Sequence, residues 1–214
     1  MGTQGSNDLL STWITGWATC RGYDRQDDGR TTSVVLTDKD GRDEHFLYEP
    51  SEELLLQVAA ETKADPNRVL TVATNRMEDL LAVTRPLSLQ VVDRQALMSA
   101  DMADQDVEDP TTPDGFVLVR HDEPGCRRVE VTFDGQPAAR GAVSVVGDFA
   151  VYDGIETEQE FRRRGLASFV MRALTAAVLE DDVRIGLLMA TTDGRELYSF
   201  LGWKQLADVF ILRG

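Results

Sequence analysis

A strand-to-helix turn in the second half of the chain carries residues suited to binding an anion. The stretch is Arg162-Arg163-Arg164-Gly165-Leu166-Ala167-Ser168. A strand is predicted to end at about Thr157, and a helix to begin at about Gly165. The first backbone N–H groups of a helix have no internal partner and, with the helix dipole, attract phosphate. Taken alone, the turn also fits a plain connection whose arginines are solvated.

Two other interpretations of this basic turn are disfavoured. The sequence contains neither G-x-x-x-x-G-K-[ST] nor G-x-G-x-x-G, the patterns of the common nucleotide-binding turns. The net charge of −15 repels the phosphate backbone of nucleic acids. Aromatic residues are not interleaved with the three arginines. We therefore expect no nucleic-acid partner.

Cysteine and histidine usage bounds the compartment and the metal chemistry. Cys20 and Cys126 are the only cysteines, and His45 and His121 the only histidines. The start of the chain lacks the features of a signal peptide, so we expect reduced thiols in a cytoplasmic protein. We expect no metal site, because no Cys/His cluster has ligand spacing. We expect no membrane partner, because no apolar run is long enough to span a bilayer.

The second half has a regular order of predicted elements. One strand comes first, and three further strands form a meander. A helix, a strand, a second helix and a last strand follow. The predicted strands are 115–120, 127–133, 139–146, 149–157, 184–190 and 209–212, and the predicted helices are 166–180 and 194–202.

The first half reads as a separate α/β region. Its first helix begins at a capping Ser6 or Asn7 and carries an apolar face that includes two tryptophans. Further elements are a hairpin over 31–48, helices over 51–63 and 76–83, and strands over 68–74 and 87–93. Residues 101–114 hold six acids and two prolines, so they are the best linker candidate.

Two motifs in the second half resemble those of the GNAT superfamily of N-acetyltransferases. The family pattern [Q/R]-x-x-G-x-[G/A] between a strand and a helix is matched by Arg162 through Ala167. A tyrosine with Gly-aromatic four residues on is matched by Tyr198 and Gly202-Trp203. The order of elements also agrees, and the resemblance covers about residues 115–214.

The resemblance implies acetyl-coenzyme A as cosubstrate and no metal. Backbone amides of residues 163–168 would hold its pyrophosphate, and its pantetheine arm would pair with residues 155–157. The last strand of the meander must then splay from the strand over 184–190, and Asp153-Gly154 could form the bulge that permits this. The implied coenzyme-binding residues are Ile155, Glu156, Thr157, Arg162, Arg163, Arg164, Gly165, Leu166, Ala167, Ser168 and Tyr198.

Direct acyl transfer to an amine needs a proton acceptor and an acid for the leaving thiolate. By resemblance Tyr198 is that acid, although a packing role beside Trp203 is the simpler alternative. Glu156 is the first candidate for the base and Asp153 the second. His121 is predicted to be an exposed loop residue.

The sequence departs from the family pattern in places. Thr191 stands where the family often has Asn, and Gly194 where Ala is common. The two helices that usually follow the first strand, and wall the acceptor site, have no room between 115–120 and 127–133. We therefore predict that a domain over residues 1–105, interpreted as a degenerate half-copy, supplies the wall for a catalytic domain over 115–214.

The expected fold class is α/β (α+β): a GNAT-like mixed twisted sheet with flanking helices and a smaller N-terminal α/β domain. The expected function is an acetyl-CoA-dependent N-acetyltransferase that moves the acetyl group directly to an amine. Because the chain is acidic, a small cationic amine or a peptide amine suits it as acceptor. The alternative is a non-catalytic acyl-CoA-binding or interaction protein on the same fold. A homodimer is compatible with the sequence.

Overall fold

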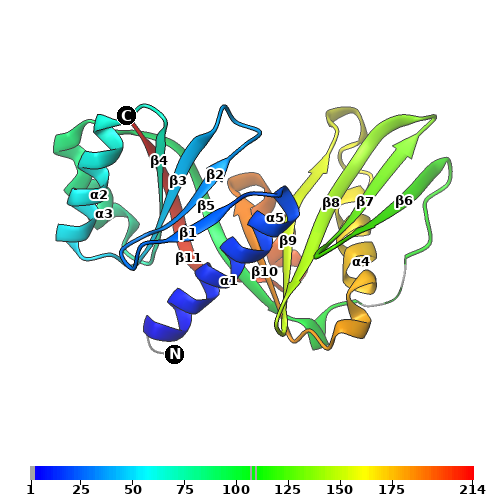
Figure 1. Cartoon of the computed structure of the whole chain (residues 1–214). Coiled ribbons are helices and arrows are strands. Elements are labelled where there is room, and N and C mark those ends of the chain that lie inside the picture. The colour runs from blue at the N-terminus through cyan, green and yellow to red at the C-terminus, as the bar shows by residue number, and fades with distance from the viewer. Residues whose placement is uncertain (1–2, 107, 109) are drawn as a thin grey trace.

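One eleven-stranded mixed sheet runs through both halves of the chain (Figure 1). The computed structural model describes the backbone of residues 3–106, 108 and 110–214, and side chains from residue 9 onward within these ranges. Along the sheet the strand order is β1-β2-β3-β4-β11-β5-β10-β9-β8-β7-β6. The N-terminal half therefore continues the sheet of the C-terminal half.

The elements of the N-terminal half follow the predicted order, with one short strand over 25–27 in addition. They are α1 (Thr3–Arg21), β1 (Arg25–Asp27), β2 (Thr32–Leu36), β3 (Arg42–Tyr48), α2 (Glu52–Ala64), β4 (Arg68–Thr74), α3 (Met77–Thr84) and β5 (Gln90–Asp101). The backbone of α1 is helical from Thr3, so the cap predicted at Ser6 or Asn7 is wrong. The hydroxyl of Ser51 accepts a hydrogen bond from the Leu54 N–H, as expected for the cap of α2.

The C-terminal half also keeps the predicted order. Its elements are β6 (Phe116–Glu123), β7 (Cys126–Phe133), β8 (Gln136–Val146), β9 (Phe149–Thr157), α4 (Leu166–Ala177), β10 (Ile185–Thr191), α5 (Thr192–Phe200) and β11 (Lys204–Arg213). Helix α4 ends three residues earlier than predicted, and β11 is far longer. His121 lies on strand β6, so its prediction as a loop residue is wrong.

The sheet has the same plan when it is followed from either end. From one end of the sheet, the strands β1, β2, β3 and β4 come before β11. At the other end β6 is the edge strand, and after it the strands β7, β8, β9 and β10 come before β5. In each half the third and fourth of these strands are parallel and joined by a helix, α2 or α4. The last strand of each half pairs with the fourth strand of the other half, and β5 and β11 pair at the centre.

Four of the five described helices cover one face of the sheet. Helices α2 and α3 pack on β4 and β11 around Leu70 and Phe210. Helices α4 and α5 contribute to a second core around Tyr152, Leu174 and Trp203. None of the described helices is both long and apolar enough to span a membrane.

Helix α1 covers the opposite face and bridges the two halves (Figure 1). Leu10, Trp13, Ile14 and Trp17 are buried against strands of both halves, as the predicted apolar face requires. A Cβ at Gly16 would come within 2.5 Å of Ser144 Oγ and Val151 Cβ, so the missing side chain lets α1 lie directly on β8 and β9.

The two cysteines form a disulfide, so the prediction of reduced thiols is wrong. Cys20, at the end of α1, is bonded to Cys126, at the start of β7, with their Cα atoms 5.1 Å apart. The two residues are 106 positions apart in sequence. Their pairing depends on the tertiary packing of α1, which no local pattern reveals.

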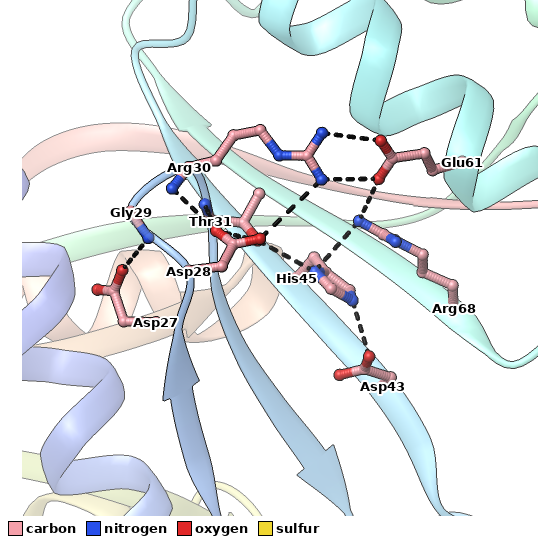
Figure 2. A network of polar contacts seen from close by, with 9 residues as sticks. All are labelled: Asp27, Asp28, Gly29, Arg30, Thr31, Asp43, His45, Glu61 and Arg68. Atoms are coloured by element: carbon pink, nitrogen blue, oxygen red, sulfur yellow. Dashed lines mark hydrogen bonds and ion pairs between the residues drawn. The ribbon is translucent and has the colours of Figure 1, made fainter.

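A polar network ties the β1–β2 turn to α2 and β4 (Figure 2). Arg30 and Arg68 both bind Glu61, at 2.8 and 3.0 Å. His45 lies between Thr31 and Asp43, which together look like a nucleophile, a base and a carboxylate. Arg68 also donates to His45 Nδ1 at 3.2 Å, so the single lone pair of that nitrogen is engaged by a cation and is not free to take a proton from Thr31. The network is therefore structural.

Candidate transfer site

The turn after β9 has the geometry of an anion cradle. Arg163 and Gly165 have positive φ angles, 62° and 77°, and α4 begins immediately afterwards. A Cβ at Gly165 would meet no atom within 4 Å, so the space above the turn is open. The intrahelical ladder begins with Phe169 N–H donating to Gly165 O. No described residue accepts a hydrogen bond from amides 163–168, which leaves these donors available for an anion.

The three arginines differ in what they contact. Arg162 donates through Nε to Thr157 O at 3.3 Å, which closes the turn against the end of β9. The Arg164 guanidinium lies 5.3 Å from the centre of the Phe161 ring, in a cation–π contact. Both side chains and that of Arg163 are exposed. The arginines therefore frame the cradle and add positive charge to it, while Leu166 is buried beneath it.

Strand β9 separates from β10 next to the cradle, as the predicted splay requires. The parallel pairing runs from Phe149 opposite Ile185 to Tyr152 opposite Leu188, and stops there. From Asp153 to Thr157, β9 pairs only with β8. Ile155, Glu156 and Thr157 thus offer a strand edge that β10 does not occupy. Met189 to Thr191 of β10 pair with β5 instead.

A β-bulge lies where the two strands separate. On β8, Ala142 is opposite Asp153 and Arg140 is opposite Glu156, so β9 has one extra residue in this interval. Gly154, with φ at 62°, lies within it. A bulge at Asp153-Gly154 was predicted, and the register confirms it. The extra residue brings the side chains of Asp153 and Glu156 to the same face of the sheet, the face covered by α1.

The two carboxylates on that face are in different surroundings. Glu156 is 58% exposed and accepts a hydrogen bond from Arg140 Nε at 2.9 Å. Asp153 is only 13% exposed and binds Arg21 of α1 through both carboxylate oxygens. The sequence named both as candidates for the base. It gave no sign of Arg21, because the contact joins residues 132 positions apart.

Tyr198 is buried on α5, with its ring beside Trp203 at 6.2 Å between centroids. Burial raises the pKa of Tyr198 to about 12, and the negative charge of Asp153 contributes to the same shift. No described residue forms a hydrogen bond with its hydroxyl. The phenol is therefore protonated at neutral pH and has a proton to donate.

Helix α5 is positioned by both halves of the chain. Thr191, where the family often has Asn, caps the helix by accepting a hydrogen bond from Gly194 N–H at 3.1 Å. At its first turn, Thr192 and Arg195 donate to backbone oxygens of β5, at 3.4 and 3.3 Å. A Cβ at Gly194 would lie 3.1 Å from the Tyr198 ring, so glycine gives that ring room.

The corresponding turn in the N-terminal half is closed. Between β3 and α2 only Glu49, Pro50 and Ser51 connect the elements, and Ser51 caps the helix itself. The Glu49 carboxylate accepts hydrogen bonds from Thr74 Oγ1 and Asn75 N–H. Strands β3 and β4 stay paired from Asp43 to Tyr48. Among the described residues, the N-terminal half therefore has neither the open cradle nor the splay.

Comparisons with known proteins agree with this geometry. Residues 144–211 match the family described as FR47-like protein. The structure is similar to a GCN5-related N-acetyltransferase from Kribbella flavida, with a TM-score of 0.66 and 17% identity, covering 96% of this chain and 93% of that one. It is also similar to a tandem GNAT protein from the clavulanic acid biosynthesis pathway, with a TM-score of 0.59 and 14% identity over 94% and 86% of the two chains.

Other comparisons are less informative about activity. A functionally unknown conserved protein from Staphylococcus epidermidis is 13% identical, with a TM-score of 0.61 over 94% of this chain and 98% of that one. No curated protein matches the sequence. At these identities the solved structures establish the fold alone. The chain thus has the GNAT fold, and its residues 144–211 match the FR47-like sequence pattern related to that superfamily.

Proposed function

We propose that the chain is an acetyl-CoA-dependent N-acetyltransferase that moves the acetyl group directly to an amine. The observation that carries the proposal is the opening between β9 and β10, with free backbone amides beside it and a buried, protonated Tyr198 whose pKa is influenced by Asp153 at the bulge. Fold similarity to N-acetyltransferases supports acyl transfer as the class of chemistry.

In this proposal the cradle binds the coenzyme by its charge and its backbone. The amides of residues 163–168 donate to the pyrophosphate, and the exposed Arg163 and Arg164 add positive potential. The pantetheine amides pair with the open edge of Ile155 to Thr157, in the way that a strand would. The thioester then lies near the bulge, between Asp153 and the phenol of Tyr198.

Tyr198 acts on the leaving group. The amine nitrogen forms a bond to the thioester carbon, and the carbon–sulfur bond then breaks, with its electron pair going to sulfur. The Tyr198 hydroxyl donates a hydrogen bond and then its proton to that sulfur as negative charge develops. Solvent reprotonates the phenol afterwards.

The proton leaving the amine goes to a carboxylate, directly or through one water. Glu156 is the proposed acceptor, because it is exposed to water and on the same face as Asp153. Asp153, held by both oxygens to Arg21, is the proposed contact for the cationic amine before its proton leaves. The two carboxylates and the acidic chain favour a small cationic amine or a peptide amine.

The test is a calorimetric titration with acetyl-CoA, followed by thiol release with a panel of amines. We expect acetyl-CoA to bind and one class of amine to release coenzyme thiol. Tyr198→Phe is expected to reduce kcat by about a hundred-fold, because the acid is lost, while acetyl-CoA still binds. Tyr48→Phe, a half-buried tyrosine of β3, is the matched control and should keep full activity.

Three outcomes separate the interpretations. No acetyl-CoA binding at millimolar concentration would contradict the proposal outright. Binding without thiol release by any amine would favour a non-catalytic acyl-CoA-binding protein. Equal kcat for Tyr198→Phe and the parent chain would remove the tyrosine from the mechanism and leave transfer itself in place.

A further inference from the structure

The last residue of α1 lies against the bulge in β9. Arg21 Nε donates to Asp153 Oδ2 at 2.6 Å, and Nη2 donates to Oδ1 at 3.3 Å. The Arg21 side chain is 35% exposed and that of Asp153 only 13%. A planar guanidinium bound by two parallel hydrogen bonds fixes the orientation of a carboxylate as well as neutralising it. Asp153 is therefore held by a residue of the N-terminal half.

The same guanidinium is connected to the β2–β3 turn. Arg21 Nη1 lies 3.8 Å from Asp38 Oδ2, and the other Asp38 oxygen accepts a hydrogen bond from the Tyr23 hydroxyl. Arg21 thus lies between two carboxylates, one from each half of the chain. Its hydrogen-bonding geometry is much better with Asp153, so that pair sets its position.

Asp153 in turn acts electrostatically on Tyr198. Its negative charge is one of the two causes that raise the pKa of the phenol, so it acts across the opening on the group that must release a proton. Without Arg21, Asp153 would be a mobile, uncompensated charge beside the tyrosine and the incoming amine. The electrostatic field at the Tyr198 hydroxyl and at the amine nitrogen therefore depends on the position in which the Arg21 guanidinium holds Asp153.

The backbone at the end of α1 is fixed by contacts to β7. Cys20, the neighbour of Arg21, is bonded to Cys126. The Cys20 carbonyl accepts a hydrogen bond from Arg128, also on β7. A covalent bond and a charge-assisted hydrogen bond therefore act on the residue just before Arg21.

We propose that Arg21 is a positioning residue for the transfer reaction, and that the Cys20–Cys126 disulfide holds it in place against Asp153. This inference rests on the function proposed above. It assigns a catalytic contribution to the N-terminal half, and it makes the rate of transfer dependent on the redox state of two cysteines outside the site.

The first experiment compares substitutions of two arginines. Arg21→Met is expected to lower kcat by about ten- to a hundred-fold, because a misplaced catalytic environment has effects of this order, with the acetyl-CoA affinity unchanged. Arg21→Lys should recover part of the loss. Arg184→Met is the matched control: Arg184 pairs with Asp148 at the far end of β9 from the bulge, and its loss should leave kcat unchanged.

The second experiment reduces the disulfide. A dithiol reductant donates two electrons and two protons to the sulfur–sulfur bond, giving the two thiols, and is itself oxidised to a cyclic disulfide. The denatured parent chain should show no free thiol before treatment and both after it. Reduction should lower kcat towards that of Arg21→Met, as should the double variant Cys20→Ser/Cys126→Ser. In the Arg21→Met chain, reduction should have no further effect, because the two changes act through one contact.

The outcomes are distinguishable from failure of the proposed function. If the parent chain transfers no acyl group, the function fails and this inference fails with it. If the parent is active but Arg21→Met behaves like Arg184→Met, Arg21 does not position the site. If reduction slows Arg21→Met as much as the parent, the disulfide acts on the fold in general, and its proposed link to Arg21 is overturned.

Discussion

Tyr152 and Tyr198 are both buried beside Trp203, yet their hydroxyls differ in their hydrogen bonding. Tyr152 shares a hydrogen bond of 2.8 Å with Thr175 Oγ1. The Tyr198 hydroxyl has no partner among the described residues. The Tyr198 ring is buried, but its hydroxyl oxygen remains accessible to solvent, so it can bond water or a ligand without the cost of an unsatisfied buried group. At the scale of the residue, a hydroxyl that is accessible and has no partner among the described residues supports the proposal that Tyr198 serves a ligand.

The two phenols also predict how stability depends on alkaline pH. Burial raises the pKa of each to about 12, while an unfolded tyrosine has a pKa of about 10. Between these values the unfolded state loses protons that the folded state keeps. The stabilising contribution of each protonated phenol is therefore fully present below pH 10, and between pH 10 and 12 the free energy of unfolding falls by about 1.4 kcal/mol per pH unit for each of these two tyrosines. Burial also raises the pKa of Tyr23, which adds to the fall in the same direction.

Denaturant unfolding measured across this pH range checks the slope. Tyr198→Phe should remove one tyrosine's share of it without loss of stability at neutral pH, because no hydrogen bond is broken. The Tyr48→Phe chain serves as the control, since it removes a half-buried phenol from β3, outside the candidate site. A parent slope equal to that of Tyr198→Phe would contradict the assignment.

At the scale of the element, the junction of β9 and α4 combines a left-handed turn with the proposed coenzyme site. Gly165 holds a left-handed conformation where a β-branched residue costs about 1–2 kcal/mol. Its missing side chain also leaves open the space over amides 163–168. One position therefore serves both the turn and the proposed ligand, and the two roles can be separated by experiment.

Gly165→Val is expected to lower stability by about 1–2 kcal/mol and to weaken acetyl-CoA binding at least ten-fold. Gly135→Val is a close control, because Gly135 has a φ of 75° and open space around it, in the turn between β7 and β8. It should lose similar stability and keep its affinity. Calorimetry and denaturant unfolding on both variants provide the comparison, and equal affinities would remove the cradle from the binding site.

The same scale shows what the sequence could and could not predict. The turn after β9, the bulge and the helices follow from local sequence patterns, and the structure has them where they were predicted, except at helix ends such as the start of α1 and the end of α4. Strand β5 was predicted as a short segment ending at 93, but it runs to Asp101, because its second part is covered on both sides by β10 and β11. The disulfide and the Arg21–Asp153 pair were missed, since each joins residues more than a hundred positions apart.

At the scale of the whole molecule, the exchanged strands join the halves more closely than two packed domains. Strand β11 pairs with β4 and β5 of the first half, and β5 separates β10 from β11. The repeated order of strands supports the proposal that the N-terminal half is a degenerate copy. Its closed turn at Glu49 to Ser51 supports the proposal of one coenzyme site per chain.

A fragment of residues 113–214 is therefore expected not to fold alone. It would expose both edges of β11 and one of β10, and it would lose α1 from one face of its sheet. Circular dichroism and amide exchange should show no cooperative structure. When fragments 1–112 and 113–214 are produced together, they should associate and remain linked by Cys20–Cys126. A stable, cooperatively unfolding 113–214 fragment would contradict this expectation.

The central position of β11 also determines when the molecule can be completed. Residues 69–74 of β4 find their partners in residues 208–213, which leave the ribosome after every other strand. Until β11 has been synthesised, β4 and β5 each present an unpaired edge at the middle of the sheet. The pairing of β4 with β11 joins residues far apart in sequence, so it has high contact order and forms slowly. The two halves can therefore close only after β11 has left the ribosome, and the nascent chain is most vulnerable to aggregation just before that strand is released.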